Sequence, residues 1–377
     1  MYNVGILTYH SAYNFGSALQ AYATQQTVNK IIGNSEIINY RLQEQDYFYQ
    51  TYYRMKYGPK VLLKDLMMFP VVGKRSVRAK RFEDFFSNYF VLTDRLTEPE
   101  EVSALWNQYS ILISGSDQIF SKKSHELRNN EWKYMDPYLL EGFNGKKISY
   151  ASSIGGATAE DIQHIVPSLQ KFDSLSFREE SVAKKIEDIL GEPIKVVLDP
   201  TFLLTKEEWI EKLKLRRVED EKYILVYSLR NPQTVSKLIK PLKAMAKKMD
   251  CKVKMVTPFT YIPLLDSTFE NHLEYGPREF LSALYNAECV VTDSYHGSIL
   301  SVNFNKDFYS LCGNTTHELR KVDILERLGL RERVISNPNI LLKQDYELID
   351  YDRINAIISD MRSESVSYLK LCLSEEK

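Results

Sequence analysis

The stretch VGILTYHSAYNFGSALQAYATQQTVNKI, residues 4–31, sets the expectation for the whole fold. It begins with a short apolar run, Val4–Tyr9, of the kind that forms a buried strand. A small polar turn follows, and Ala18–Ile31 then carries apolar residues three and four positions apart, as in a helix. A strand, a turn and a helix in this order are the repeating unit of parallel sheets that helices cover on both faces.

The strand–helix unit recurs along the chain. Further apolar runs predict strands in the first half, at Glu36–Tyr40, Ser110–Ile113, Lys147–Ala151, Ser174–Phe177 and Ile194–Leu198. After the charge-rich connector Lys212–Lys222 the alternation restarts, with strands at Tyr223–Leu229, Lys252–Thr257, Glu288–Thr292 and Phe308–Cys312. We therefore predict an α/β protein with two Rossmann-like, doubly wound domains, residues 1–211 and 212–377. A C-terminal helix over 351–373 is expected to pack back on the first domain.

The composition narrows the class of protein. A length of 377 residues fits two domains, and 44% hydrophobic with 26% charged residues excludes a largely disordered chain. The 49 Lys and Arg residues balance 50 Asp and Glu residues, so we expect no nucleic-acid partner. Four cysteines in no disulfide or metal-ligand spacing, no signal peptide and no apolar run of about 18 residues favour a cytoplasmic protein without a metal.

A long insertion, over about residues 43–88, interrupts the alternation. Between Thr51 and Phe82, nine basic residues stand against one acidic residue, with aromatic and aliphatic residues interleaved. This composition suits an anionic membrane surface and predicts peripheral attachment to the inner face of the cell membrane. The alternative is a helical lid whose apolar side packs on the first domain and whose charges are solvated.

Ligands of doubly wound sheets bind beyond the carboxyl ends of the strands, so the residues after each predicted strand are the candidates. In the first half these residues are small and polar: Asn14, Gly16 and Ser17 after the first strand, Ser116, Asp117 and Gln118 after the third, and Ser152 and Ser153 after the fourth. Arg178 follows the fifth strand, where its guanidinium either binds an anionic ligand or pairs with Glu179 or Glu180.

The segment VVTDSYHGS, residues 290–298, runs from an apolar strand into a helix in the second half. It places His296 at the mouth of the second sheet, with Asp293 nearby. Histidine is the side chain best suited to exchange protons near neutral pH, so His296 is the candidate acid–base residue and Asp293 a group that tunes or orients it. Helix amides near Gly297 and Ser298 would favour an anion.

Seven segments, in their order along the chain, resemble the polysaccharide pyruvyl transferase family. They are NFGSALQAYA (14–23), ISGSDQIF (113–120), SYASSIG (149–155), SFREESVAKKI (176–186), VVLDPTFLL (196–204), EFLSALYNAECVVTDSYHGSILSVNF (279–304) and LGLRER (328–333). One familiar version of the family's C-terminal motif reads Arg-Leu-His-Gly, whereas this chain has Ser294-Tyr295-His296-Gly297 and so lacks one anion contact.

The resemblance implies a fold similar to the GT-B glycosyltransferases, with two Rossmann-like domains facing a cleft. It implies transfer of the pyruvyl unit of phosphoenolpyruvate to a saccharide, usually as a ketal bridging two hydroxyls, with no cofactor. By the same resemblance, Arg178 contacts phosphoenolpyruvate and His296 is the proton-transfer residue. The donor would be bound by Arg178, Ser294, Tyr295, His296, Gly297 and Ser298, and the acceptor by the polar loops of the first domain.

Family members act on saccharides that are often carried on a membrane lipid, so the acceptor is expected to be polymeric or linked to undecaprenyl diphosphate. Two alternatives stay open. The first is a GT-B-type glycosyltransferase that uses a nucleotide sugar, and the second is a saccharide-binding paralogue without catalytic activity. The presence of both Arg178 and His296 argues against the second alternative.

Overall fold

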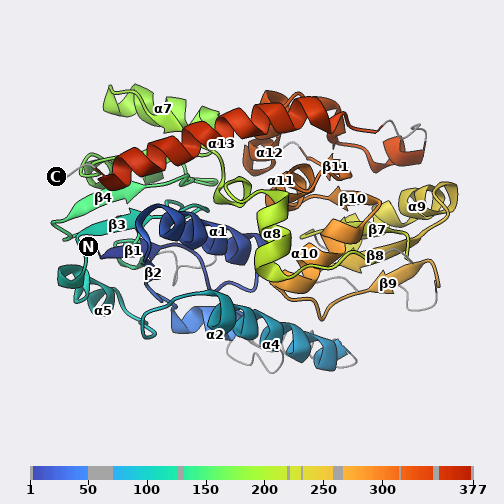
Figure 1. The fold of residues 1–377 in the computed structure, drawn as a ribbon, viewed down its shortest axis with the longest axis horizontal. Helices are drawn as coiled ribbons and strands as arrows, with labels where there is room; N and C mark the ends of the chain where they lie inside the picture. Colours follow the sequence, from blue (N-terminus) through green and yellow to red (C-terminus); the bar gives the residue numbers. More distant parts are fainter. Residues whose placement is uncertain are drawn as a thin grey trace. The chain divides into compact units, whose positions relative to one another are not determined.

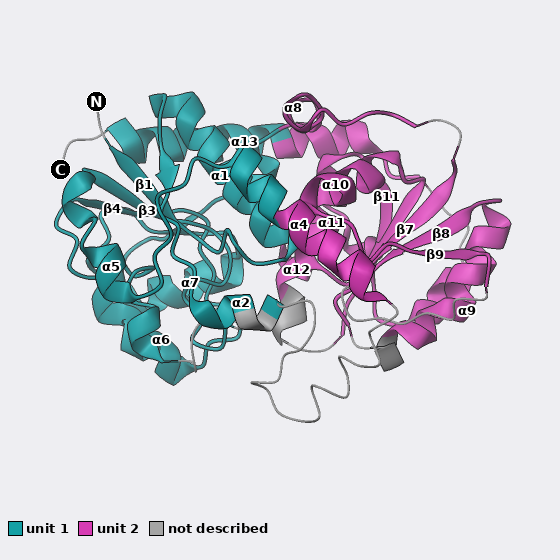
Figure 2. Cartoon of the chain, turned by 90° about the horizontal axis from the view of Figure 1, so that it is seen from below, with its two compact units in different colours: residues 1–70, 83–204, 359–377 teal, residues 71–82, 205–358 magenta. Residues whose placement is uncertain are grey.

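The computed structural model describes residues 3–49, 71–124, 131–218, 221–230, 232–257, 266–313, 316–342 and 348–374. The chain divides into two compact units, drawn in teal and magenta in Figure 2. Residues 1–70, 83–204 and 359–377 belong to the first unit, and residues 71–82 and 205–358 to the second. Each unit is built around its own parallel sheet.

The first unit contains a parallel sheet with the strand order β2-β1-β3-β4 (Figure 1). Its strands are β1 (Val4–Leu7), β2 (Glu36–Ile37), β3 (Ile111–Ser114) and β4 (Lys146–Ser149). A parallel pair, β5 (Ser176–Phe177) and β6 (Lys195–Val196), is linked to the residues after β4 by a bridge between Ser152 and Phe177. The strand order reverses between β1 and β3, and such a reversal opens a ligand crevice beyond the carboxyl ends of the strands.

Helix α1 (Phe15–Ile32) follows β1 and is buried along most of its length. Asn14 caps it, because the Asn14 Oδ1 accepts a hydrogen bond from the Gly16 amide at 2.9 Å. Gly33 ends the helix with φ 90°, a backbone conformation that favours glycine. The other α-helices that begin and end in this unit are α2 (Gln43–Tyr49), α5 (Pro99–Ser103), α6 (Ala159–Leu169) and α7 (Glu180–Leu190).

The second unit contains a parallel sheet with the strand order β12-β11-β10-β7-β8-β9. The strands are β7 (Tyr223–Tyr227), β8 (Lys252–Val256), β9 (Phe269–Asn271), β10 (Cys289–Thr292), β11 (Asp307–Leu311) and β12 (Val334–Ile335). The helices are α8 (Lys206–Leu213), α9 (Pro232–Lys248), α10 (Pro277–Asn286), α11 (Tyr295–Asn303) and α12 (Thr316–Arg327). Numbered along this unit, the order is the doubly wound arrangement whose switch point lies between β7 and β10.

The sheets confirm the predicted α/β class with two doubly wound halves. The boundary between the compact units differs from the predicted one, since the second unit begins at residue 205 and takes in α8. The C-terminal helix α13 (Tyr351–Ser374) belongs to the first unit from residue 359 onward. Two hydrogen bonds hold it there: the Leu198 amide donates to Ser365 Oγ at 3.0 Å, and Arg362 Nε donates to the Phe202 carbonyl oxygen at 2.5 Å.

The described part of the insertion includes helix α4 (Val72–Tyr89), whose first half belongs to the second unit. Three of its basic side chains donate to backbone carbonyl oxygens just after β9: Lys74 to Asn271 at 2.8 Å, Arg78 to Tyr275 at 3.4 Å and Arg81 to Glu274 at 2.9 Å. These contacts explain why residues 71–82 join the second unit, which a sequence pattern with no partner in view could not indicate. They favour the packed-helix alternative for this part, while residues 50–70 lie outside the described ranges.

The carboxyl group of Glu274 strengthens the docking of α4. Burial raises its pKa, but the hydrogen bond with His272 and the charge of Lys74 bring the pKa down to about 2. The ammonium group of Lys74 lies 3.5 Å from this carboxylate. Across the parts of the chain that the structure describes, no helix is both long enough and apolar enough to cross a membrane.

Candidate active site

The first candidate region lies at the switch point of the first sheet, beyond β1 and β3. Ser17, in the first turn of α1, donates its hydroxyl to Asp117 Oδ2 at 2.7 Å. Asp117 follows β3 and has φ 76°, a left-handed backbone conformation that a residue with a side chain rarely adopts. The fold therefore brings together two polar loops that are 100 residues apart in the sequence.

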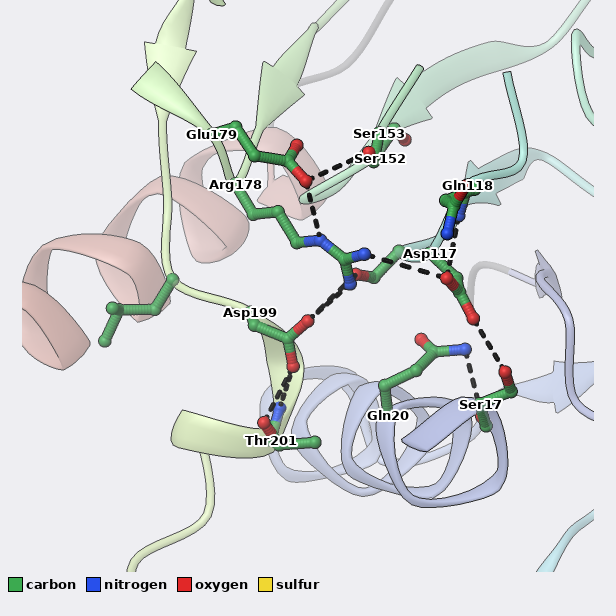
Figure 3. A network of polar contacts seen from close by, with 12 residues as sticks. Ser17, Gln20, Asp117, Gln118, Ser152, Ser153, Arg178, Glu179, Asp199 and Thr201 are labelled. Atoms are coloured by element: carbon green, nitrogen blue, oxygen red, sulfur yellow. Dashed lines mark hydrogen bonds and ion pairs between the residues drawn. The ribbon is translucent and has the colours of Figure 1, made fainter. Parts of the chain in front are cut away.

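Arg178 is buried in the same region, at the end of β5, with 1% of its side chain exposed. Three carboxylates surround its guanidinium, as Figure 3 shows. The Arg178 Nη1 donates to Asp199 Oδ2 at 2.6 Å and the Nε to Glu179 Oε1 at 3.3 Å. The Nη2 lies 3.6 Å from Asp117 Oδ1. Of the two possibilities that the sequence left open for Arg178, the described contacts are those of an ion pair with Glu179.

The remaining candidates of the first half support this network. Ser116 Oγ accepts from Arg178 Nη1 at 3.1 Å, and Ser153 Oγ donates to Glu179 Oε1 at 3.0 Å. Ser152 Oγ donates to the Gly115 carbonyl oxygen at 3.0 Å, and the Gln118 amide donates to Asp117 Oδ1 at 2.9 Å. Asn14 and Gly16 meet in the cap of α1 and have no described contact with Arg178.

The charge of the network suits a neutral ligand better than an anion. One guanidinium stands against three carboxylates, all largely buried, so the group as a whole is negative. Gln20 Oε1 is buried beside it and accepts no hydrogen bond from the described residues. A surplus of acceptors is what hydroxyl groups of a saccharide would satisfy. Binding of a dianion by Arg178 would first require one of its ion pairs to open.

The second candidate region lies at the switch point of the second sheet, where β7 and β10 end. His296 is the second residue of α11 and is 7% exposed. Its ring packs edge-on against Tyr295, with ring centroids 5.2 Å apart. The predicted position of His296 at the carboxyl end of a strand in the second sheet is therefore where the fold places it.

The first turn of α11 is fixed by its own small residues. Ser294 caps the helix, since its Oγ accepts from the Gly297 amide at 3.3 Å. Ser298 Oγ donates to the Ser294 carbonyl oxygen at 3.0 Å and lies 2.8 Å from Ser310 Oγ on β11. A Cβ atom at Gly297 would come within 2.3 Å of Thr292 Oγ1, so only glycine lets this turn approach β10. Four of the predicted donor-binding residues, Ser294, Tyr295, Gly297 and Ser298, thus also build the turn that carries His296.

Asp293 contacts the loop after β7. Its Oδ1 accepts from the Leu229 amide at 2.8 Å, its Oδ2 accepts from the Ser228 hydroxyl, and Arg230 Nε lies 3.7 Å away. These are the contacts of a residue that holds the loop. The role in tuning His296 stays a prediction.

Several residues at these sites escaped the sequence analysis. Asp199 directly follows a predicted strand, and that position was the signal that could have found it. Lys321, from α12, is 2% exposed and donates to the carbonyl oxygens of Asp293, at 2.7 Å, and Leu311. It brings a positive charge to the carboxyl ends of β10 and β11. No sequence signal marks it, because Lys321 lies in the middle of a helix rather than after a strand.

His10, the other histidine that follows a strand, is a buried structural residue. Its Nδ1 lies 3.1 Å from the Thr8 carbonyl oxygen and its Nε2 lies 3.0 Å from Asn39 Oδ1. Burial lowers the pKa of His10, so the ring is neutral at physiological pH. Among the described residues, no group of three or more His, Cys, Asp or Glu side chains is arranged to hold a metal ion.

Known proteins resemble this chain in sequence pattern and in fold. The sequence model of the polysaccharide pyruvyl transferase family matches residues 14–311. No curated protein matches the chain. UDP-GlcNAc 2-epimerase from Methanocaldococcus jannaschii is 12% identical with a TM-score of 0.56, covering 96% of this chain and 100% of that one. S. aureus MnaA, solved with UDP, is 11% identical with a TM-score of 0.55, covering 100% of this chain and 99% of that one.

A third solved structure, Neisseria meningitidis UDP-GlcNAc 2-epimerase bound to UDP-GlcNAc, is 10% identical with a TM-score of 0.52, covering 100% of this chain and 95% of that one. At such identities the likeness concerns the fold alone, and it confirms the predicted GT-B-like fold with Rossmann-like halves. The family match is the more specific finding, because it includes the loops around Ser17, Asp117, Arg178 and His296. The chain belongs to the polysaccharide pyruvyl transferase family.

Proposed function

We propose that this protein transfers the pyruvyl unit of phosphoenolpyruvate to a saccharide and forms a cyclic ketal on it. The observation that carries the proposal is the position of His296 at the switch point of the second sheet, on the edge to which Lys321 brings a buried positive charge. A proton donor and fixed positive charge are what a doubly anionic enol phosphate needs. The donor is therefore assigned to the second unit.

The proposed chemistry begins when His296 gives a proton to the methylene carbon of phosphoenolpyruvate. The central carbon becomes electron-poor and bonds to the oxygen of one saccharide hydroxyl, whose proton leaves with the phosphate. A second hydroxyl adds to the same carbon as the carbon–phosphate oxygen bond breaks, and its proton returns to His296. The products are the ketal and inorganic phosphate, so the reaction needs no cofactor or metal.

The acceptor is assigned to the first unit. The network of Ser17, Asp117 and Arg178 carries a surplus of carboxylates, which hydrogen-bond well to hydroxyl groups and repel a second anion. Ser116, Gln118, Ser152 and Ser153 lie on the same loops and complete the proposed acceptor side. The direct contact between Arg178 and the donor, which the resemblance implies, stays a prediction.

The first test measures which donor the purified protein uses. We expect phosphoenolpyruvate to raise the melting temperature, and a panel of saccharides and lipid-linked saccharides to release phosphate and gain one pyruvyl unit by mass spectrometry. Stabilisation by ligand follows RT ln(1 + [L]/Kd), so the true donor is recognised without knowing the acceptor. Stabilisation by nucleotide sugars alone would contradict the proposal and favour a glycosyltransferase. A saccharide that binds with no turnover from any donor would favour a non-catalytic paralogue.

We also propose that the enzyme works in the cytoplasm at the inner face of the membrane, on an acceptor linked to undecaprenyl diphosphate in surface-polysaccharide synthesis. The support is the basic and apolar composition of residues 51–82. We expect the protein to float with vesicles that contain anionic lipid and to remain unbound with neutral vesicles, and salt should weaken the binding. Absence of flotation with anionic vesicles would overturn the membrane attachment and leave the transferase proposal intact.

A further inference from the structure

The loop after β7 presents a second cation at the switch point of the second sheet. Arg230 follows this strand, and 27% of its side chain is exposed. Its Nη2 donates to the Leu311 carbonyl oxygen at 3.4 Å, and the same oxygen accepts from Lys321. Arg230 and Lys321 therefore meet at the carboxyl end of β11, one partly exposed and the other buried.

The position of Arg230 is set by Asp293. The Asp293 carboxylate accepts hydrogen bonds from the Ser228 hydroxyl and the Leu229 amide and lies 3.7 Å from Arg230 Nε. Because 3% of the Asp293 side chain is exposed, its carboxylate is fixed inside the protein and holds the loop on one side only. The described contacts leave the function of Asp293 pointing toward Arg230 rather than toward His296.

We propose that Arg230 binds the phosphate group of the donor and that Asp293 is the positioning residue for Arg230. This inference rests on the proposed function for the identity of the donor. The physical reason is charge: a guanidinium offers a planar pair of donors to a phosphate, and a partly exposed one can do so without first losing a buried ion pair. Arg178, enclosed by three carboxylates, lacks that advantage.

The switch point gives the assignment its geometry. In a doubly wound sheet the ligand lies where the strand order reverses, which is between β7 and β10 here. Arg230 comes from the loop after β7, and His296 from the helix after β10. The two residues thus come from the two sides of one reversal and can contact the two ends of a small donor, the phosphate and the methylene carbon.

The test is a calorimetric titration of phosphoenolpyruvate and, separately, of inorganic phosphate into the full-length protein. We expect Arg230→Gln to weaken phosphoenolpyruvate binding by about 10–100-fold, the range for losing a hydrogen bond to a charged group. Arg230→Lys should recover part of the loss. Arg331→Gln is the matched control, since Arg331 is 57% exposed and pairs with Glu326, and it should leave both affinities unchanged.

A double-mutant cycle tests the role of Asp293. If Asp293 positions Arg230, Asp293→Asn weakens phosphoenolpyruvate binding, and the double variant binds little more weakly than Arg230→Gln alone. If Asp293 instead tunes His296, Asp293→Asn leaves the affinity unchanged, and that result would overturn the positioning role. Urea unfolding of each variant separates lost binding from lost folding.

The two ligands separate the inference from the proposed function. Unchanged affinities in Arg230→Gln would overturn the inference while the donor assignment stands. A wild-type protein that binds phosphate but not phosphoenolpyruvate would overturn the proposed function, and the loss of phosphate binding in Arg230→Gln would still support the phosphate contact. A wild-type protein that binds neither would overturn both.

Discussion

Replacing His296 by glutamine is expected to lower the rate of pyruvyl transfer by about 10²–10⁴-fold, the usual contribution of a general acid–base residue. Glutamine keeps a similar size and polarity in the first turn of α11 but cannot deliver a proton. Because His296 is 7% exposed and packs on Tyr295, the fold should survive the change. The measurement is steady-state phosphate release with saturating phosphoenolpyruvate and an acceptor found in the panel.

Two further readings make the His296 result specific. The affinity of His296→Gln for phosphoenolpyruvate, measured by calorimetry, should stay close to that of the wild type, since the loss lies in proton transfer rather than in binding. His164→Gln is the control for a general effect of losing an imidazole, because the His164 ring stacks on Trp132 in the first unit, away from both sheet edges described above. Near-wild-type turnover in His296→Gln would reject its role.

Replacing Arg178 by glutamine should lower the free energy of unfolding by about 3–5 kcal/mol, because the change removes one partner of a buried ion pair and leaves carboxylates uncompensated. The Arg178 side chain is 1% exposed and contacts Asp199, Glu179 and Asp117. A loss of this size is a large fraction of the roughly 5–15 kcal/mol that stabilises a protein of ordinary stability. The measurement is urea unfolding followed by circular dichroism.

Lys171→Gln provides the control for Arg178→Gln. Lys171 pairs with Glu141 at 3.0 Å, but its side chain is 54% exposed, and exposed pairs contribute about 0–1 kcal/mol. If Arg178→Gln cannot be purified, Asp199→Asn tests the same network, since it keeps the shape of the side chain and removes one charge. A free energy of unfolding within about 1 kcal/mol of wild type, with weakened phosphoenolpyruvate binding, would show that Arg178 serves the donor and not the network.

The elements of the fold were largely predictable. The apolar runs predicted β1, β3, β4, β7, β8, β10 and β11, because strands buried on both faces must be apolar throughout. The edge strands β9 (Phe269–Asn271) and β12 (Val334–Ile335) escaped prediction, since two or three residues carry no periodicity. The assignment of residues 71–82 to the second unit also escaped, because it depends on carbonyl groups about 200 positions away.

The candidate site divides in the same way. Ser17, Asp117, Arg178 and His296 were predicted because each follows a strand, and the ends of parallel strands meet at one edge of a sheet. The partners of these residues were not predictable. Glu179 was one of two adjacent candidates for Arg178, and Asp199 was not considered, although it makes the shortest of the three ion pairs.

The sequence by itself determined the doubly wound class, the family and the positions at which polar residues leave the strands, since periodicity and motif order are local properties of a chain. Only the tertiary structure decided the electrostatics. It surrounded Arg178 with carboxylates, brought Lys321 from α12 to the ends of β10 and β11, and tied Asp293 to the loop that carries Arg230. The physical reason is that charge acts through space, so the character of each site depends on which residues the fold places side by side.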